Sequence, residues 1–153
     1  MKHGTFLVFC VILLTACSIN PETRIISSYL EGFGKDIDDY RVICFIPADG
    51  FSSCIEPSLN YSLTAGEDYL LVLTSLYSKS IHNTVETYHL DTGRMLVDEN
   101  NKAVSLQLLL PTAPCFYFIE DGIVQKRADL SKTYDKTGIL SEVSRFLGKS
   151  AGE

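Results

Sequence analysis

The sequence predicts one α/β domain built around a mixed β-sheet. Residues 41–47 and 69–74 hold unbroken apolar runs, which is the pattern of strands that a sheet buries on both faces. Asp121 and Gly122 separate two further strand-like runs, as in the turn of an antiparallel hairpin. Strands with helical segments between them, followed by a hairpin and a last helix, describe an α/β sandwich in which helices flank a mixed central sheet.

A helix and a strand open the folded part of the chain, and a second helix follows. In residues 22–33 the apolar side chains recur at the spacing of one helical face. The strand at 41–47 leads through a turn into a helix that begins at Ser52 or Ser53. Pro57 permits a helix to start but restricts its interior, so we expect this helix to be short or kinked.

The middle of the chain holds two more strands and two weaker helical segments. The buried strand at 69–74 is followed by a weakly helical stretch at 79–90 and a short strand at 94–97. Residues 98–101, Asp-Glu-Asn-Asn, form a turn-rich cluster. A short helix is expected at 104–109, before the hairpin.

The C-terminal part of the chain holds the clearest signals. Residues 115–119 and 123–127 are strand-like runs on either side of Glu-Asp-Gly, and they predict two antiparallel strands joined by a tight turn. Residues 139–147 carry an apolar stripe opposite a polar one, which predicts an amphipathic helix that packs on the sheet.

The first residues have the pattern of an export signal. Lys2 is the only formal charge before an apolar run at 6–14, which is too short for a membrane-spanning helix of about 20 residues. Leu-Thr-Ala-Cys at residues 14–17 resembles the lipobox of bacterial lipoproteins, in which the cysteine receives lipid and becomes the first residue. The resemblance implies a signal peptide at 1–16 and a membrane anchor on Cys17. An ordinary cleaved signal beside a chance cysteine is the alternative.

The charge of the chain and the residues after Cys17 indicate its location. Removal of residues 1–16 takes away one Lys, so the formal net charge changes from −6 to −7. This acidity argues against binding to nucleic acid or to anionic head groups, and it leaves the lipid as the membrane contact. No acidic run follows Cys17, and Ser18 differs from the aspartate associated with inner-membrane retention. We therefore expect a cell-envelope protein at the outer membrane, facing the periplasm.

The cysteines argue against a metal site and a dithiol motif. The signal peptide contains one of the five cysteines and the lipid occupies a second, which leaves Cys44, Cys54 and Cys115. An odd number in an oxidising compartment leaves at least one thiol free or paired with another molecule. Neither Cys-x-x-Cys nor a zinc-ligand spacing occurs, so no metal or other cofactor is expected.

Two segments resemble the thioredoxin-like superfamily, in particular its membrane-anchored thiol-disulfide oxidoreductases. Residues 46–55, Ile-Pro-Ala-Asp-Gly-Phe-Ser-Ser-Cys-Ile, are similar to the first core strand and the active-site helix of that family. Cys54 matches the second cysteine of the family's pair, and Phe51 stands where the first, attacking cysteine would be. Residues 113–122 are similar to the family's cis-proline strand, with Pro114 matching the cis-proline.

The resemblance covers residues 35–148 and implies a thioredoxin-like three-layer sandwich. The domain would occupy residues 35–153, after a lipid-anchored segment with a short helix at 17–34. The length of chain between Cys54 and Pro114 implies the form of the fold that has an extra helix and strand inserted in the middle. Another α/β sandwich is the alternative.

The resemblance also implies a function, and Phe51 alters it. Disulfide exchange requires one thiolate that attacks and a second thiol that resolves the mixed disulfide, and Phe51 cannot attack. The first hypothesis is therefore a domain without this activity, whose groove beside Phe51 and Pro114 holds an extended polypeptide. The second is a single-cysteine or rearranged oxidoreductase that uses Cys54 or Cys115, two residues that could form a disulfide if their Cα atoms came within about 7 Å. Packing is the simpler role for all three cysteines. A structural lipoprotein on another α/β fold is the third hypothesis.

Overall fold

The computed structural model describes residues 20–50, 52–130 and 135–148. Within these residues one sheet contains five strands, namely β1 (Val42–Pro47), β2 (Tyr69–Thr74), β3 (Met95–Asp98), β4 (Cys115–Glu120) and β5 (Ile123–Asp129). The helices are α2 (Pro21–Glu31), α3 (Ser52–Ser62), α4 (Ser78–Tyr88), α5 (Lys102–Ser105) and α6 (Lys136–Gly148), with 3₁₀ turns η1 (Ile37–Asp39) and η2 (Thr92–Arg94). All strands expected from the sequence are confirmed.

The order of strands across the sheet is β3-β2-β1-β4-β5. β1, β2 and β3 are parallel, with Phe45 beside Val72 and Val72 beside Leu96. β4 runs antiparallel to β1, with Cys115 opposite Phe45, and β5 runs antiparallel to β4. The predicted α/β sandwich with a mixed sheet is therefore confirmed.

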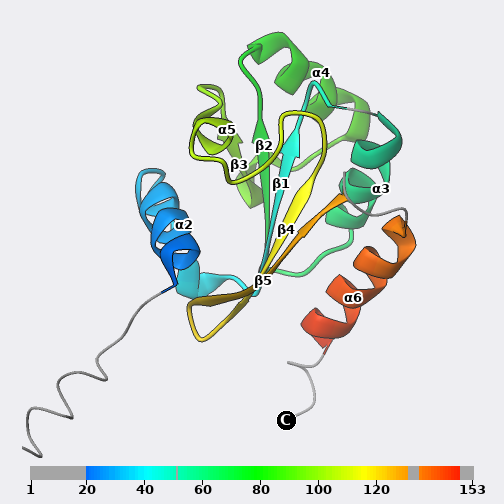
Figure 1. The fold of residues 1–153 in the computed structure, drawn as a ribbon. Helices are drawn as coiled ribbons and strands as arrows, with labels where there is room; N and C mark the ends of the chain where they lie inside the picture. Colours follow the sequence, from blue (N-terminus) through cyan, green and yellow to red (C-terminus); the bar gives the residue numbers. More distant parts are fainter. Residues whose placement is uncertain (1–19, 51, 131–134, 149–153) are drawn as a thin grey trace, which may run out of the picture.

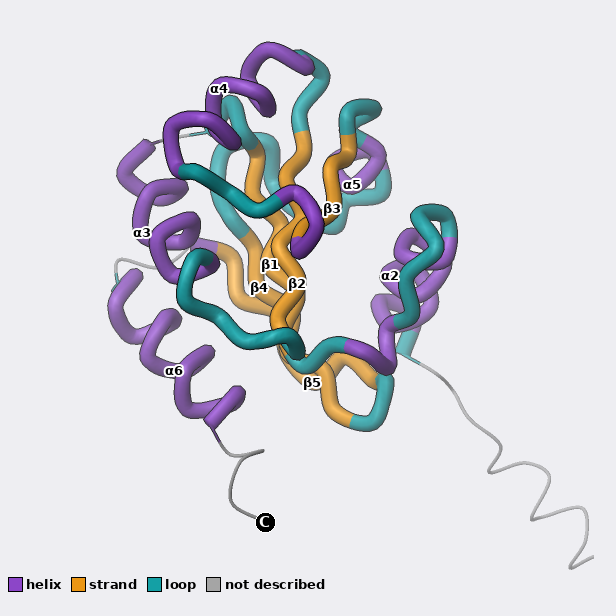
Figure 2. Tube along the Cα trace, turned by 180° about the vertical axis from the view of Figure 1, so that it is seen from behind, coloured by secondary structure: helices purple, strands orange, loops and turns teal. Residues whose placement is uncertain are grey.

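Helices cover both faces of the sheet, as Figures 1 and 2 show. α2 and α5 lie on the face where Phe45 and Tyr117 are buried. α3, α4 and α6 lie on the other face, over Cys44 and Leu71. Every residue of β1 and β2 is buried, which explains why both strands are continuous apolar runs rather than alternating patterns.

The N-terminal helix α2 packs into the core of the sandwich. Leu30 is fully buried, and the hydroxyl of Tyr29 donates a hydrogen bond to Oδ2 of the buried Asp98 at 3.2 Å. At the start of the helix, the Thr23 hydroxyl accepts a hydrogen bond from the N–H of Val124 in β5 at 3.0 Å. Residues before position 35 thus share one core with the rest of the described chain.

The short helix α5 begins earlier than expected. The sequence predicted residues 104–109, whereas α5 spans Lys102–Ser105. The carboxylate of Asp98 accepts hydrogen bonds from the N–H groups of Lys102 and Ala103 at 3.1 and 2.8 Å, and so starts the helix directly after the turn. Gln107 then adopts a positive φ of 60°, a conformation that does not continue a helix.

The sequence predicted a short or kinked helix around Pro57, and helix α3 continues through this proline over eleven residues. Pro57 has no N–H to donate to the carbonyl of Ser53, four residues earlier. Nζ of Lys136, at the start of α6, donates to that carbonyl instead at 2.7 Å. The hydroxyl of the buried Ser58 also donates to the Cys54 carbonyl at 3.2 Å. Side chains therefore supply hydrogen bonds around the proline.

The β4–β5 hairpin turns at Asp121 and Gly122, as predicted. Their φ angles are 51° and 69°, so both residues adopt the left-handed backbone conformation. Turns of this kind match the twist of the two strands that they join. The carboxylate of Asp38, in η1, lies against Gly122 where a side chain at that position would have to be. Glycine is therefore favoured at position 122 by both its backbone angle and its neighbour.

Candidate functional site

The carboxyl ends of the parallel strands form one edge of the sheet, where several loops meet (Figure 1). The loop after β1 leads to α3, and the loop after β2 leads to α4. The Ser75 hydroxyl donates a short hydrogen bond to the Asp49 carboxylate, and the Ser75 N–H donates to the Asp98 carbonyl at 3.3 Å. These bonds join the loops that follow β1 and β2 to the end of β3.

The loop before β4 reaches the same edge. The carbonyl oxygen of Thr112 lies 2.8 Å from the point where a Cβ atom on Gly50 would be, so the two loops touch and a side chain at position 50 would collide with backbone. Pro114 follows, buried and one residue before β4. The structure thus brings the loop before Pro114 beside the start of α3. We call the exposed part of these loops the carboxyl-edge surface; it comprises residues 48–50, 76–77 and 111–112.

The cis peptide bond expected before Pro114 is not found. No peptide bond between described residues is cis, so the bond from Ala113 to Pro114 is trans, the form that most X-Pro bonds adopt. The Pro114 carbonyl accepts a hydrogen bond from the N–H of Leu130 at 3.0 Å, and the Ala113 N–H donates to the Leu110 carbonyl at 3.5 Å. Two backbone groups beside Pro114 therefore already have partners within the chain.

Two large apolar side chains are exposed on the carboxyl-edge surface. Leu76 and Tyr77 are each 66% exposed, more than any other large apolar residue in the described part of the chain. The N–H of Tyr77 donates to the hydroxyl of Ser75 at 2.8 Å, which fixes the backbone of this loop. Sequence reasoning missed this pair, although two apolar residues that directly follow a buried strand and a serine were visible in the sequence.

Cys54 is half-buried in the first turn of α3. The carbonyl of its neighbour Ser53 is held by Lys136, so this end of α3 is attached to the start of α6. Among the predicted site residues that the structure describes, Cys54 is the only cysteine with solvent access.

Cys44 and Cys115 are fully buried and are poor nucleophiles. Burial raises the pKa of the Cys44 thiol to about 12, although a hydrogen bond with Tyr69 acts in the opposite direction. Burial also raises the pKa of Cys115 well above its ordinary value, and the nearby Asp129 carboxylate raises it further. Both thiols therefore stay protonated near neutral pH, and the thiolate is the reactive form.

No disulfide joins Cys54 and Cys115. The Cys115 side chain belongs to the core beneath α2, whereas α3, which carries Cys54, covers the opposite face of the sheet. All three cysteines of the described chain are free thiols.

The remaining predicted residues, Phe51 and Cys17, lie outside the described part of the chain. Over residues 20–50, 52–130 and 135–148, no group of three His, Cys, Asp or Glu side chains is placed to hold a metal ion. None of the helices described has the length and apolar character that a membrane crossing requires.

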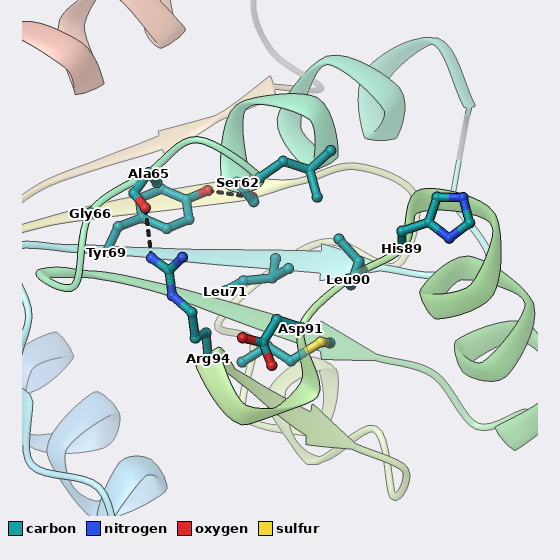
Figure 3. Close-up of a pocket in the computed structure, with 11 residues that line it drawn as sticks. Ser62, Ala65, Gly66, Tyr69, Leu71, His89, Leu90, Asp91 and Arg94 are labelled. Carbon is teal, nitrogen blue, oxygen red and sulfur yellow. Dashed lines mark hydrogen bonds between the residues drawn. The ribbon is translucent and has the colours of Figure 1, made fainter.

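A cavity of about 140 Å³ lies at the other end of the sheet, between the end of α3, the start of β2 and the loop after α4 (Figure 3). Leu71 and Met95 contribute buried apolar lining. At its rim the Arg94 guanidinium donates to the Ala65 carbonyl at 2.8 Å. No residue predicted from the sequence as a site residue lines this cavity, and it is separate from the carboxyl-edge surface.

No family model matches the sequence, and no curated protein matches it. Among solved structures, the chain is similar to the crystal structure of a thioredoxin-like protein from Parabacteroides distasonis, with a TM-score of 0.44 and 17% sequence identity, over 69% of this chain and 82% of that chain. The topology described above has the expected parts: β1-α3-β2 is the parallel unit, β4-β5-α6 is the antiparallel unit, and α4 with β3 is the predicted insertion. The fold is an α/β sandwich with a mixed five-stranded sheet, and its elements follow one another in the order that the resemblance implied.

Proposed function

We propose that this protein is a cell-envelope lipoprotein whose thioredoxin-like domain binds extended polypeptides and does not catalyse disulfide exchange. The observation that carries the proposal is the carboxyl-edge surface, where Leu76 and Tyr77 are exposed beside the loops that meet at Gly50 and Thr112. Full burial of such an apolar side chain contributes about 1.5–3 kcal/mol, so a partner that covers both gains useful affinity.

The cysteines support the absence of exchange chemistry. An exchange reaction needs an attacking thiolate and a resolving thiol. Phenylalanine occupies position 51, and the raised pKa values of Cys44 and Cys115 keep both thiols protonated. Cys54 is then the one accessible thiol in the described chain, without a second accessible thiol to resolve a mixed disulfide.

In the proposed complex the bound polypeptide buries apolar side chains of this protein and does not add a strand beside Pro114. The sequence hypothesis placed an extended segment against the backbone beside a cis-proline, whereas the Pro114 carbonyl and the Ala113 N–H already have partners in the chain. We therefore place the segment across Leu76 and Tyr77. Pro114 is buried behind the loop that ends at Thr112, and Phe51 lies outside the described residues.

The lipoprotein part of the proposal rests on the sequence. Leu-Thr-Ala-Cys at residues 14–17, after one Lys and a short apolar run, is the pattern that receives lipid on the cysteine. Acylation of Cys17 would hold the domain at the outer membrane, because several acyl chains on one residue bind a bilayer firmly.

Metabolic labelling tests the anchor. In a bacterium supplied with an alkyne-tagged palmitate, we expect the full chain to carry the tag and to sediment with membranes. The variant Cys17→Ala should lose the tag while being made at a similar level. An untagged wild-type chain in the soluble fraction would contradict the proposal.

A binding assay tests the surface. A fluorescent, carboxymethylated and unfolded polypeptide provides the ligand, and anisotropy reports its affinity. Replacing Leu76 and Tyr77 with serine should weaken binding about tenfold or more, which corresponds to about 1.4 kcal/mol or more. Replacing Leu63 and Ile123, which are 46% and 45% exposed elsewhere, is the matched control and should leave affinity unchanged. Equal losses in both double variants would rule out a specific site.

The half-buried thiol of Cys54 supports one alternative function, a single-cysteine oxidoreductase. With dithiothreitol as reductant, we expect insulin reduction at the same rate with the purified protein, with Cys54→Ala, and without protein. A rate above background that Cys54→Ala abolishes would establish the alternative. A maleimide should modify Cys54 in the folded protein and Cys44 and Cys115 only in denaturant.

A further inference from the structure

The chain enters the described domain beside the β4–β5 hairpin. Nδ2 of Asn20 donates to the Val124 carbonyl at 3.5 Å, and the Val124 N–H donates to the Thr23 hydroxyl at 3.0 Å. Val124 is the second residue of β5, so it lies next to the turn. Figure 1 shows the start of α2 and this turn at the same end of the sheet.

The carboxyl-edge surface lies at the opposite end. β1 begins beside the hairpin, because the Ile119 N–H donates to the Arg41 carbonyl at 2.8 Å, and it ends at Pro47, directly before the carboxyl-edge surface. Six extended residues span about 20 Å. The point of entry and the carboxyl-edge surface are therefore separated by about the length of β1.

The entry end is strongly acidic. The loops that precede β1 and β2, together with the end of β4 and the hairpin turn, contain seven carboxylates and two basic side chains. The carboxylates are those of Asp36, Asp38, Asp39, Glu67, Asp68, Glu120 and Asp121, and the basic side chains are those of Lys35 and Arg41. We call this end the acidic pole. An anionic bilayer repels it at separations within a Debye length of about 8–10 Å, so charge opposes close contact with the head groups, and the length of the tether sets the orientation.

From this placement we infer that the anchored domain stands with its acidic pole toward the membrane and presents the carboxyl-edge surface to water-soluble polypeptides of the envelope. The inference rests on the lipid on Cys17 in the proposed function. Cys17 precedes Asn20 by three residues, which reach at most about 11 Å. In an inverted domain, with the carboxyl-edge surface on the bilayer, Asn20 would be about 20 Å from the bilayer, beyond that reach. The partner is therefore a soluble polypeptide and not a segment embedded in the membrane.

Fluorescence quenching in vesicles tests the orientation. The full chain, made with its own signal in a Cys54→Ser background, is purified from membranes and reconstituted into phosphatidylethanolamine–phosphatidylglycerol vesicles that carry a head-group quencher. A fluorophore is attached at Glu120→Cys in the acidic pole or at Tyr77→Cys on the carboxyl-edge surface. The pair Glu67→Cys and Leu76→Cys repeats the comparison, in case one variant of the first pair does not fold.

We expect the label in the acidic pole to be quenched at least about fivefold more strongly than the label on the carboxyl-edge surface, since their distances from the bilayer differ by about 20 Å. Equal quenching, as in a domain that lies on its side, or stronger quenching at position 77 would overturn the orientation while leaving the lipid anchor intact. An unacylated, soluble product would overturn both the anchor and the orientation.

A second measurement tests the class of partner. The reconstituted protein should bind the unfolded, carboxymethylated polypeptide from solution with an affinity within about twofold of that in detergent, because a surface about 20 Å from the acidic pole is open to solvent. A loss of binding on vesicles would show that the membrane covers the surface and would refute a soluble partner.

Discussion

The contact between Lys136 and Ser53 makes a quantitative prediction about helix α3. Pro57 leaves the Ser53 carbonyl without its helical donor, and Nζ of Lys136 takes that place at 2.7 Å. A hydrogen bond from a charged donor contributes about 1.5–3 kcal/mol when buried, but this one is exposed to solvent, so water replaces part of it. We expect Lys136→Met to lower the free energy of unfolding by about 0.5–1 kcal/mol.

A double-mutant cycle isolates this contact. In Pro57→Ala the new N–H of residue 57 can donate to the Ser53 carbonyl. In that background Lys136→Met should lower the free energy of unfolding by less than about 0.3 kcal/mol. Urea unfolding followed by circular dichroism measures all four proteins. Lys79→Met, which removes an exposed lysine of α4, controls for the loss of a positive charge from an acidic protein. The same cost of Lys136→Met in both backgrounds would refute the reasoning.

Three further predictions concern stability. Tyr29→Phe removes the buried hydrogen bond to Asp98 and should lower the free energy of urea unfolding by about 1–2 kcal/mol, whereas an unchanged midpoint would mean that this bond contributes nothing net. The folded state keeps the Cys44 proton until about pH 12, whereas the unfolded state releases it near the ordinary pKa of 9.0. The contribution of this protonated thiol to the free energy of unfolding is therefore fully present below pH 9 and is lost as the pH rises toward 12. Between pH 9 and 11 the free energy of unfolding should fall with pH less steeply in Cys44→Ala than in the wild type, by about 1.4 kcal/mol per pH unit. The same pH dependence in both proteins would contradict the raised pKa. Gly122→Ala forces a side chain into a left-handed position against Asp38 and should cost about 1 kcal/mol or more in thermal or urea unfolding, and a neutral effect would show that the turn adapts.

Elements with a strong local signal were predictable from the sequence. β1 and β2 are continuous apolar runs, and only burial on both faces of a sheet satisfies such runs. Asp121 and Gly122 adopt the left-handed angles that a tight hairpin needs, so two neighbouring residues were enough to predict that turn. The loop before Pro114 and the start of α3 also lie side by side, as the resemblance implied.

By itself, then, the sequence determined the class of fold, the order of its elements, the hairpin and the absence of a second cysteine three positions from Cys54. Only the tertiary structure decided where α5 begins, how α3 passes Pro57, on which face of the sheet Cys115 lies, and that Leu76 and Tyr77 are left exposed. The physical reason is the distance along the chain between partners. Strand and turn signals arise from neighbouring residues, whereas the hydrogen bond that supports α3 joins residues 83 positions apart, and no local pattern encodes such a pair.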